Sequence, residues 1–144
     1  SISVALKSYN QIVSALIVDP IKNETFYAEK NNGAFFNNQR IRVSKRNNLN
    51  ECLFGTNKNG IIKSELNCRV SGSAALDLAY VGAGRLDGFF QNNLKLWDIA
   101  AGILIVQEAG GKVNDINLEK IDKIELIATS SNINDKLSDK LINF

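Results

Sequence analysis

The sequence of 144 residues contains no histidine and no methionine, and it has only two cysteines. The lack of histidine removes the commonest general base, and with it every Ser–His or Cys–His nucleophile scheme. Any chemistry must therefore rest on carboxylates, hydroxyls, backbone amides and a hard metal ion. The lack of methionine leaves two alternatives open: the initiator was removed, or the chain is part of a longer protein.

Long apolar runs and a signal peptide are also missing. No run approaches the roughly 20 apolar residues that span a bilayer, so we expect no membrane partner. Cys52 and Cys68 form neither a metal-binding nor a redox spacing, which predicts two free thiols in a cytoplasmic protein.

The remaining composition is ordinary for a soluble domain, with 44% hydrophobic and 22% charged residues. The length is that of one domain with a sizeable core. The net charge is +2 and the signs are interspersed, so composition gives no reason to expect nucleic acid as a partner.

The first third of the sequence is rich in β-branched residues and turn residues. This pattern predicts strands over 2–6, 12–19 and 25–30 and a hairpin over 31–44. We place Asn38 in the turn of that hairpin. Residues 45–68 are polar and weakly patterned, which indicates a loop with a possible strand over 51–55.

The second half has helical periodicity. Apolar residues at 75, 76, 79 and 80 share one face of a helix expected within 71–84, capped by Ser71 or Ser73. A second helix over 98–109 is apolar on nearly every face and is therefore predicted to be buried. Strands and a closing helix are expected over 86–91, 112–115, 124–130 and 132–144. Alternating strands and helices favour a layered α/β domain.

One carboxylate, Asp98, stands beside Trp97 at the start of the apolar segment WDIAAGILIVQEAGG. Read locally, it has two explanations. It could cap the first turn of the buried helix, with Trp97 in the core. Alternatively, it could point into a cleft and bind a hard cation through oxygen.

The same segment resembles the C-terminal signature of the inositol monophosphatase family, which comprises Mg²⁺-dependent phosphatases of small phosphate esters. Further segments follow the family pattern in order: SISVAL, DPIKNETFYAEKNNGAFFNNQRIRVS, GSAALDLAYVGAGRLDGFF and EAGGKVND. The likeness covers nearly all of residues 1–44 and 69–144. It favours the cation-binding explanation of Asp98.

The resemblance implies a fold, which is a layered α/β/α/β sandwich of the inositol monophosphatase and sugar phosphatase type with its N-terminal part missing. Residues 1–50 would be a remnant of the N-terminal antiparallel sheet, 51–68 a connecting loop, and 69–144 the C-terminal α/β domain. Because that sheet would lack its N-terminal partners, we expect an exposed apolar face and an open strand edge there. Association through this face leaves a homodimer open.

The resemblance also implies site residues. Asp98 matches a ligand of the second catalytic metal, so Mg²⁺ is the implied cofactor. Gly72, Ser73 and Ala74 match a segment that contacts the alcohol portion of the substrate. Gln91 stands where many members have a substrate-binding glutamate, so its neutral amide puts the usual inositol preference in doubt.

Two family motifs are absent, Gly-x-Glu and Asp-Pro-[Ile/Leu]-Asp-Gly-Thr, which carry most of the metal ligands. We therefore expect no complete catalytic set in this chain. Asp77 is predicted to face solvent one turn into its helix, and Asp87 to lie in the turn before residue 88. Neither is expected to restore the site. The family helix that falls between positions 55 and 69 is predicted to be shortened or deleted.

Two functional hypotheses follow. In the first, the chain is the C-terminal portion of a Mg²⁺-dependent phosphatase of small phosphomonoesters, such as inositol monophosphate or another polyol phosphate, and is inactive alone. In the second, it is a non-catalytic binding or interaction module derived from that family. An unrelated α/β ligand-binding domain is a third, weaker alternative.

Overall fold

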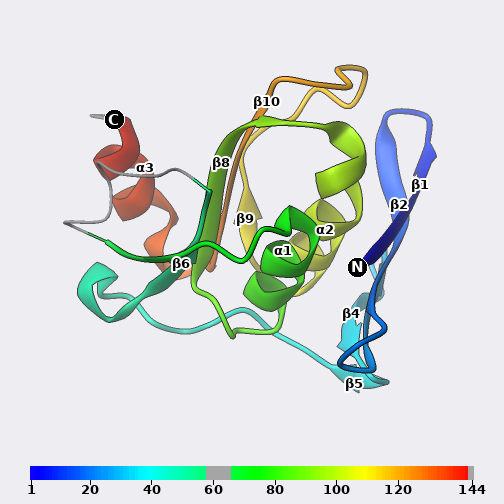
Figure 1. The fold of residues 1–144 in the computed structure, drawn as a ribbon, viewed down its shortest axis with the longest axis horizontal. Coiled ribbons are helices and arrows are strands. Elements are labelled where there is room, and N and C mark those ends of the chain that lie inside the picture. Colours follow the sequence, from blue (N-terminus) through cyan, green and yellow to red (C-terminus); the bar gives the residue numbers. More distant parts are fainter. Residues whose placement is uncertain (58–65, 143–144) are drawn as a thin grey trace.

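The computed structural model describes residues 1–57 and 66–142. Two sheets and the helices α1, α2 and α3 form successive layers (Figure 1). The first sheet, the α1–α2 pair, the second sheet and α3 follow one another across the molecule. The predicted layered α/β architecture is confirmed.

The first sheet contains five antiparallel strands in the order β1-β2-β3-β4-β5. Their bounds are Ile2–Ser8, Gln11–Asp19, Glu24–Glu29, Gly33–Phe36 and Gln39–Arg40. The predicted strands and hairpin are therefore present. Asn38 lies in the hairpin turn with φ +68°, a left-handed conformation that asparagine tolerates better than most residues.

Helices α1 (Ala74–Gly82) and α2 (Leu96–Glu108) pack against each other between the two sheets. The prediction of a buried helix is confirmed, although α2 begins at Leu96 rather than at 98. Gly102 permits the close approach of the two helices, because a Cβ there would lie 2.4 Å from the Cβ of Leu78. Helix α2 also lies along β1–β4 of the first sheet.

The second sheet is mixed, with the strand order β7-β6-β8-β10-β9. Its strands are β6 (Leu53–Gly55), β7 (Asn67–Arg69), β8 (Gly88–Leu94), β9 (Lys112–Val113) and β10 (Ile124–Thr129). Helix α3 (Asn134–Ile142) covers its other side over a separate apolar cluster. Short 3₁₀ turns lie at Leu49–Glu51 and Ser131–Ile133.

Strand β6 lies within the range predicted as a connecting loop, at the place where a strand was considered possible. It pairs in parallel with β7 and β8, so the ends of that range belong to the second sheet. The helix predicted to be shortened or deleted falls largely outside the described residues. Within the described residues, no helix has the length and hydrophobicity needed to cross a bilayer.

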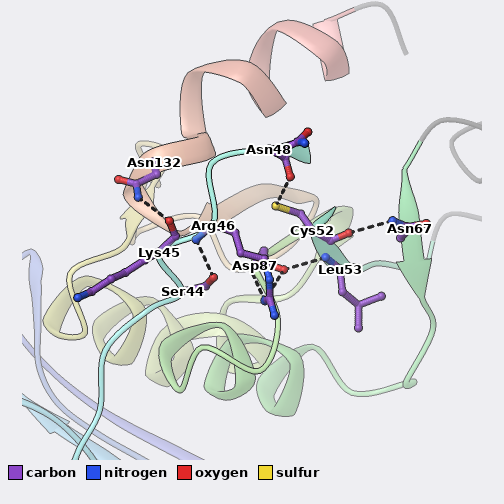
Figure 2. Close-up of polar contacts among 9 residues, drawn as sticks. All are labelled: Ser44, Lys45, Arg46, Asn48, Cys52, Leu53, Asn67, Asp87 and Asn132. Atoms are coloured by element: carbon purple, nitrogen blue, oxygen red, sulfur yellow. Dashed lines mark hydrogen bonds and ion pairs between the residues drawn. The ribbon is translucent and has the colours of Figure 1, made fainter. Parts of the chain in front are cut away.

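A segment over residues 44–53 connects the sheets and is tied to the second one (Figure 2). The side chain of Asp87 is fully buried and accepts hydrogen bonds from Leu53 N at 2.8 Å and from Arg46 Nη1 at 3.2 and 3.3 Å. The Asn132 side chain donates to Lys45 O at 3.0 Å. Asp87 lies in the bend directly before β8, as predicted, and its carboxylate anchors the connecting segment.

Both cysteines are free, as predicted. Cys52 is buried in the connecting segment, and its thiol contacts Asn48 O at 3.2 Å. Burial, reinforced by the nearby charge of Asp87, raises the pKa of Cys52 to about 11. A thiol with that pKa is almost entirely protonated at neutral pH and is therefore a poor nucleophile.

Candidate functional site

One pocket of about 430 Å³ contains every residue that the sequence singled out for binding. It lies where the start of β1, the start of α1, the end of β8 and the start of α2 meet. Its lining includes Gly72, Ser73, Ala74, Gln91 and Asp98. Residues from four separate elements therefore converge on one cavity, with Trp97, Ser1 and Ser3 completing its walls.

The start of α1 supplies hydrogen-bond donors to this pocket. Ser73 is the N-cap, and its hydroxyl accepts a hydrogen bond from Leu76 N at 3.3 Å. Of the two serines considered as the cap, Ser73 is therefore correct, while Ser71 Oγ accepts from Ser73 N at 3.1 Å. The remaining free amides of the first turn can bind oxygen atoms of a ligand.

Gly72 leaves open the space beside the start of α1. Its φ is +84°, a conformation that favours glycine, and a Cβ placed there would meet nothing within 4 Å. The backbone conformation rather than crowding therefore requires glycine, and the space beside it is available to a ligand.

Asp98 is the third residue of α2 and is exposed. The helix N-cap is Lys95, which makes no side-chain cap, and the Asp98 carboxylate makes no hydrogen bond with any described residue. The capping explanation is therefore wrong, and Trp97 is 58% exposed rather than part of the core. A carboxylate at a helix N-terminus that makes no hydrogen bond of its own is available to a cation.

Gln91 reaches the pocket from β8, where it pairs with Leu126 of β10 and is half-buried. Arg69 does not line this pocket. It lies beside a neighbouring hollow of about 500 Å³ with Lys22 and Tyr80. Gln91 therefore presents a neutral amide to the cavity.

The prediction that Asp77 faces solvent is wrong, because this residue is only 4% exposed. A Cβ on Gly55 of β6 would lie 2.9 Å from the Asp77 Cγ, so the glycine makes room for the carboxyl group. Burial raises the pKa of Asp77 to about 6, although a hydrogen bond from Ser71 partly opposes that shift. The periodicity placed Asp77 off the apolar face, but helix α1 is enclosed on that side too.

Asp77 also lies beside the predicted site. It lines a small cavity of about 70 Å³ together with Gly72, Ser73, Ala74 and Gln91. Thr56 and Asn57 belong to the same cavity. The sequence analysis did not identify Asp77, Thr56 or Asn57 as site residues. The separation of four residues between Ser73 and Asp77, which places both on one side of a helix, was the signal that could have identified Asp77.

The described residues do not form a complete metal centre. Among residues 1–57 and 66–142, no group of three or more His, Cys, Asp or Glu side chains is placed to hold a metal ion. Mg²⁺ prefers six oxygen ligands in octahedral geometry. Asp98 fits the role of one Mg²⁺ ligand, but a single carboxylate does not form a complete magnesium site.

Another hollow, of about 400 Å³, lies at the far end of α2 beside Gln107 and Glu108. None of the predicted site residues lines it. The Glu108 carboxylate there accepts hydrogen bonds from Asn31 N and Gly33 N, each at 2.9 Å. This carboxylate therefore fixes the turn between β3 and β4.

Comparison with known proteins places these features in a family. The profile described as "Inositol monophosphatase family" matches residues 1–143. A Thermotoga maritima protein named fructose-1,6-bisphosphatase/inositol-1-monophosphatase is 44% identical over 126 residues, covering 81% of this chain and 49% of that protein. A Neisseria meningitidis protein named putative Nus factor SuhB is 43% identical over 134 residues, covering 83% of this chain and 51% of that protein.

The crystal structure of the extragenic suppressor protein SuhB from Bartonella henselae is similar to the whole described fold. Its TM-score is 0.88 at 45% identity, over 96% of this chain and 62% of that chain. The chain thus spans about half the length of the curated relatives that it matches.

Proposed function

Because the chain belongs to the inositol monophosphatase family, we propose that it supplies the alcohol-binding side of a Mg²⁺-dependent phosphomonoesterase site. The observation that carries the proposal is the convergence of Gly72, Ser73, Ala74, Gln91 and Asp98 on one pocket. The phosphatase class is that of the family, whereas the substrate, the metal and the role of each residue are proposals.

In this proposal Asp98 binds one Mg²⁺ ion, which would neutralise charge on the phosphoryl group and activate water. The chain's own contribution is positioning. The amides at the start of α1 and the Ser73 hydroxyl contact the leaving alcohol, and Gln91 donates or accepts hydrogen bonds with a ligand hydroxyl. Gly72 lets a polyol approach the backbone closely.

Chemistry by this chain alone is not expected. Phosphoryl transfer by metal ions needs several carboxylates and a group that orients the attacking water. Among the described residues that line the 430 Å³ pocket, Asp98 is the only carboxylate. We propose that the remaining ligands come from polypeptide that carries the family's Gly-x-Glu and Asp-Pro-[Ile/Leu]-Asp-Gly-Thr motifs.

The test is to fuse to this chain the part of the Thermotoga maritima relative that lies outside the matched region, and to measure phosphate release from inositol monophosphate and sugar phosphates. We expect Mg²⁺-dependent turnover that Asp98→Asn lowers by about 100-fold or more, since one ligand carries several kcal/mol of charge stabilisation. Asp122→Asn, at an exposed position outside the pocket, is the matched control. Equal rates for the two variants would refute the ligand assignment.

The second part of the test uses the 144-residue chain without the fusion. We expect calorimetry to show no sub-millimolar Mg²⁺ affinity and no phosphate release from the same substrates. Turnover by the chain alone, with Mg²⁺ affinity abolished by Asp98→Asn, would contradict this part of the proposal.

A second candidate is a non-catalytic binding module derived from the family. The single carboxylate in the pocket and the neutral Gln91 favour it. The encoding reading frame separates the candidates, because upstream Gly-x-Glu and Asp-Pro-x-Asp-Gly-Thr motifs support a phosphatase. If the fusion binds a polyol phosphate without hydrolysing it at any Mg²⁺ concentration, the binding module is the correct assignment.

A further inference from the structure

The buried carboxyl group of Asp77 is connected to the turn that lines the 430 Å³ pocket. Asp77 is 4% exposed, and its carboxyl group lies so close to β6 that a Cβ on Gly55 would be 3.0 Å from Asp77 Oδ2. A hydrogen bond joins the same carboxyl group to the side chain of Ser71. Asp77 therefore contacts the residue with which the turn before α1 begins.

Ser71 connects this carboxyl group to the backbone of the turn. Its Oγ accepts a hydrogen bond from Ser73 N at 3.1 Å and lies 3.4 Å from Ser73 O. A serine hydroxyl has one hydrogen to donate and two lone pairs with which to accept. The Ser71 hydrogen therefore points either to the Asp77 carboxyl group or to Ser73 O, and never to both at once.

The turn that Ser71 holds faces the ligand pocket. Gly72, Ser73 and Ala74 line both the 430 Å³ pocket and the adjoining 70 Å³ cavity. Ala74 and Ala75 also line the larger pocket and belong to the first turn of α1, whose amides have no partner within the helix. The direction of these donors depends on the conformation of the turn before them.

We infer that Asp77 is a positioning residue of this pocket, which acts through Ser71 to fix the Gly72–Ala74 turn, and that a neutral polyol binds more tightly when Asp77 is ionised. Since the ligand is the polyol of the proposed function, this role of Asp77 rests on that proposal. The two residues form one hydrogen-bonded unit beneath the ligand, and Asp77 itself does not contact the ligand.

The effect of the charge follows from the hydrogen-bond inventory. The ionised carboxylate only accepts, so it takes the Ser71 hydrogen. A hydroxyl that donates to a charged acceptor is itself a stronger acceptor, so Ser71 Oγ then binds Ser73 N more firmly. A turn that is fixed before binding orders the ligand at a lower cost in entropy. The protonated carboxyl group leaves the Ser71 hydrogen to Ser73 O and holds the turn less firmly.

The change of protonation falls in an accessible pH range. Burial raises the pKa of Asp77 to about 6, and the hydrogen bond from Ser71 partly opposes that shift. The carboxyl group is therefore mostly protonated at about pH 5 and mostly ionised above about pH 7.

The charged groups around Asp77 do not govern this titration. The hollow of about 500 Å³ that Asp77 also borders is lined by Lys22, Arg69, Tyr80 and Arg85. Arg85 is paired with Glu24 at 2.8 Å, and Asp98 of the neighbouring helix α2 lies in the 430 Å³ pocket. As far as the structure describes the chain, the other residues that line the 70 Å³ cavity carry no charge. Burial and the Ser71 hydrogen bond set the pKa of Asp77.

The first experiment follows the full 144-residue chain by NMR from about pH 5 to 8 without any ligand. We expect the Ser73 amide signal to titrate together with the Asp77 carboxyl signal, with a midpoint near 6. Asp77→Asn should remove this titration. Ser71→Ala should uncouple the Ser73 amide from it and move the Asp77 midpoint to higher pH, because the Ser71 hydrogen bond lowers that pKa. Asp122→Asn, at an exposed position, is the control and should change neither signal.

The second experiment measures binding of myo-inositol to the same chain by calorimetry at about pH 5 and 7.5. We expect the affinity to be about threefold or more higher at the upper pH. In Asp77→Asn and Ser71→Ala the affinity should be the same at both pH values and close to that of the unchanged chain at the lower one. Asp122→Asn should keep the full pH dependence, and circular dichroism should show that all three variants fold.

Three outcomes would overturn the inference. One is a Ser73 amide signal that does not change across the pH range. Another is an affinity for myo-inositol that is equal at both pH values in the unchanged chain, which leaves the proposed function standing. The third is a loss of affinity in Asp77→Asn that Ser71→Ala does not reproduce, because Asp77 then contacts the ligand itself. If myo-inositol binds at neither pH while Ser73 titrates as expected, the polyol of the proposed function is refuted and the positioning of the turn by Asp77 is supported.

Discussion

Two buried carboxylates, Asp77 beside the pocket and Asp87 against the connecting segment, occupy different electrostatic surroundings. Asp87 is fully buried and has a cationic partner, Arg46, and a backbone donor, Leu53 N. Asp77 is almost as buried, but within the described part of the chain its ionisation is eased by the Ser71 hydroxyl and by no cation. Its pKa is accordingly raised to about 6 by burial.

The difference separates a structural carboxylate from one poised beside a ligand cavity. A buried charge with a guanidinium and an amide anchors the chain segments that supply those donors. A desolvated carboxyl group next to a pocket is instead a candidate for a functional role. Asp77 lines the 70 Å³ cavity with Ser73 and Gln91, which fits the second description.

Removing the cation from the connecting region is expected to have the largest effect on stability. Arg46→Ala leaves the Asp87 carboxylate fully buried with Leu53 N as its remaining donor among the described residues, so we expect a loss of about 2–4 kcal/mol in the free energy of unfolding. Lys45→Ala is the neighbouring control, because its side chain points away from Asp87 (Figure 2). Denaturant unfolding measures both variants, and equal losses would show that the Arg46 ion pair anchors nothing.

The Asp77→Asn variant tests the comparison of the two buried carboxylates through the pH dependence of stability. The folded state holds a proton on Asp77 up to about pH 6, whereas the unfolded chain releases it near 3.8. Folding therefore binds protons between these values, and the free energy of unfolding contributed by this group falls as pH rises from about 4 to 6.

We thus expect Asp77→Asn to be neutral at pH 4 and to raise stability at pH 8 by roughly 1–3 kcal/mol. Denaturant unfolding at the two pH values measures the difference. Asp122→Asn, an exposed position, should show no such pH dependence. A variant that is destabilised at pH 8 would mean that the ionised carboxylate is favourably held.

The smallest effect is expected at the surface of the connecting region. Lys136 Nζ donates to Asn47 O at 2.6 Å, but both residues are exposed. Water replaces such a contact at little cost, so Lys136→Ala should reduce stability by less than about 1 kcal/mol. A loss above that of Arg46→Ala, in the same unfolding assay, would reverse the assignment of Asp87 as the anchor.

Much of the fold follows from local patterns in the sequence. Alternating β-branched residues predict the first sheet, and the all-round apolar segment predicts the buried helix α2. The bounds differ by up to four residues because element ends depend on three-dimensional contacts. Helix α2 begins at Leu96 without a side-chain cap, which no local pattern indicates.

The candidate site was found by likeness to a family rather than by spacing. Local spacing favoured a cap over a cation ligand for Asp98, and its uncommitted carboxylate in the structure contradicts the cap. Asp77 was missed because a periodicity of apolar residues identifies one face of a helix only. It gives no information on what encloses the opposite face.

The sequence by itself determined which segments are strands and helices, and that both thiols are free. These depend on neighbouring residues and on side-chain chemistry, which the sequence contains directly. Only the tertiary structure decided that Gly72, Gln91 and Asp98 share a pocket, and that Asp77 and Asp87 are buried with different partners. Those properties arise from residues far apart in the chain, such as Gly55 beside Asp77, and burial fixes the energy of a charge only after such contacts form.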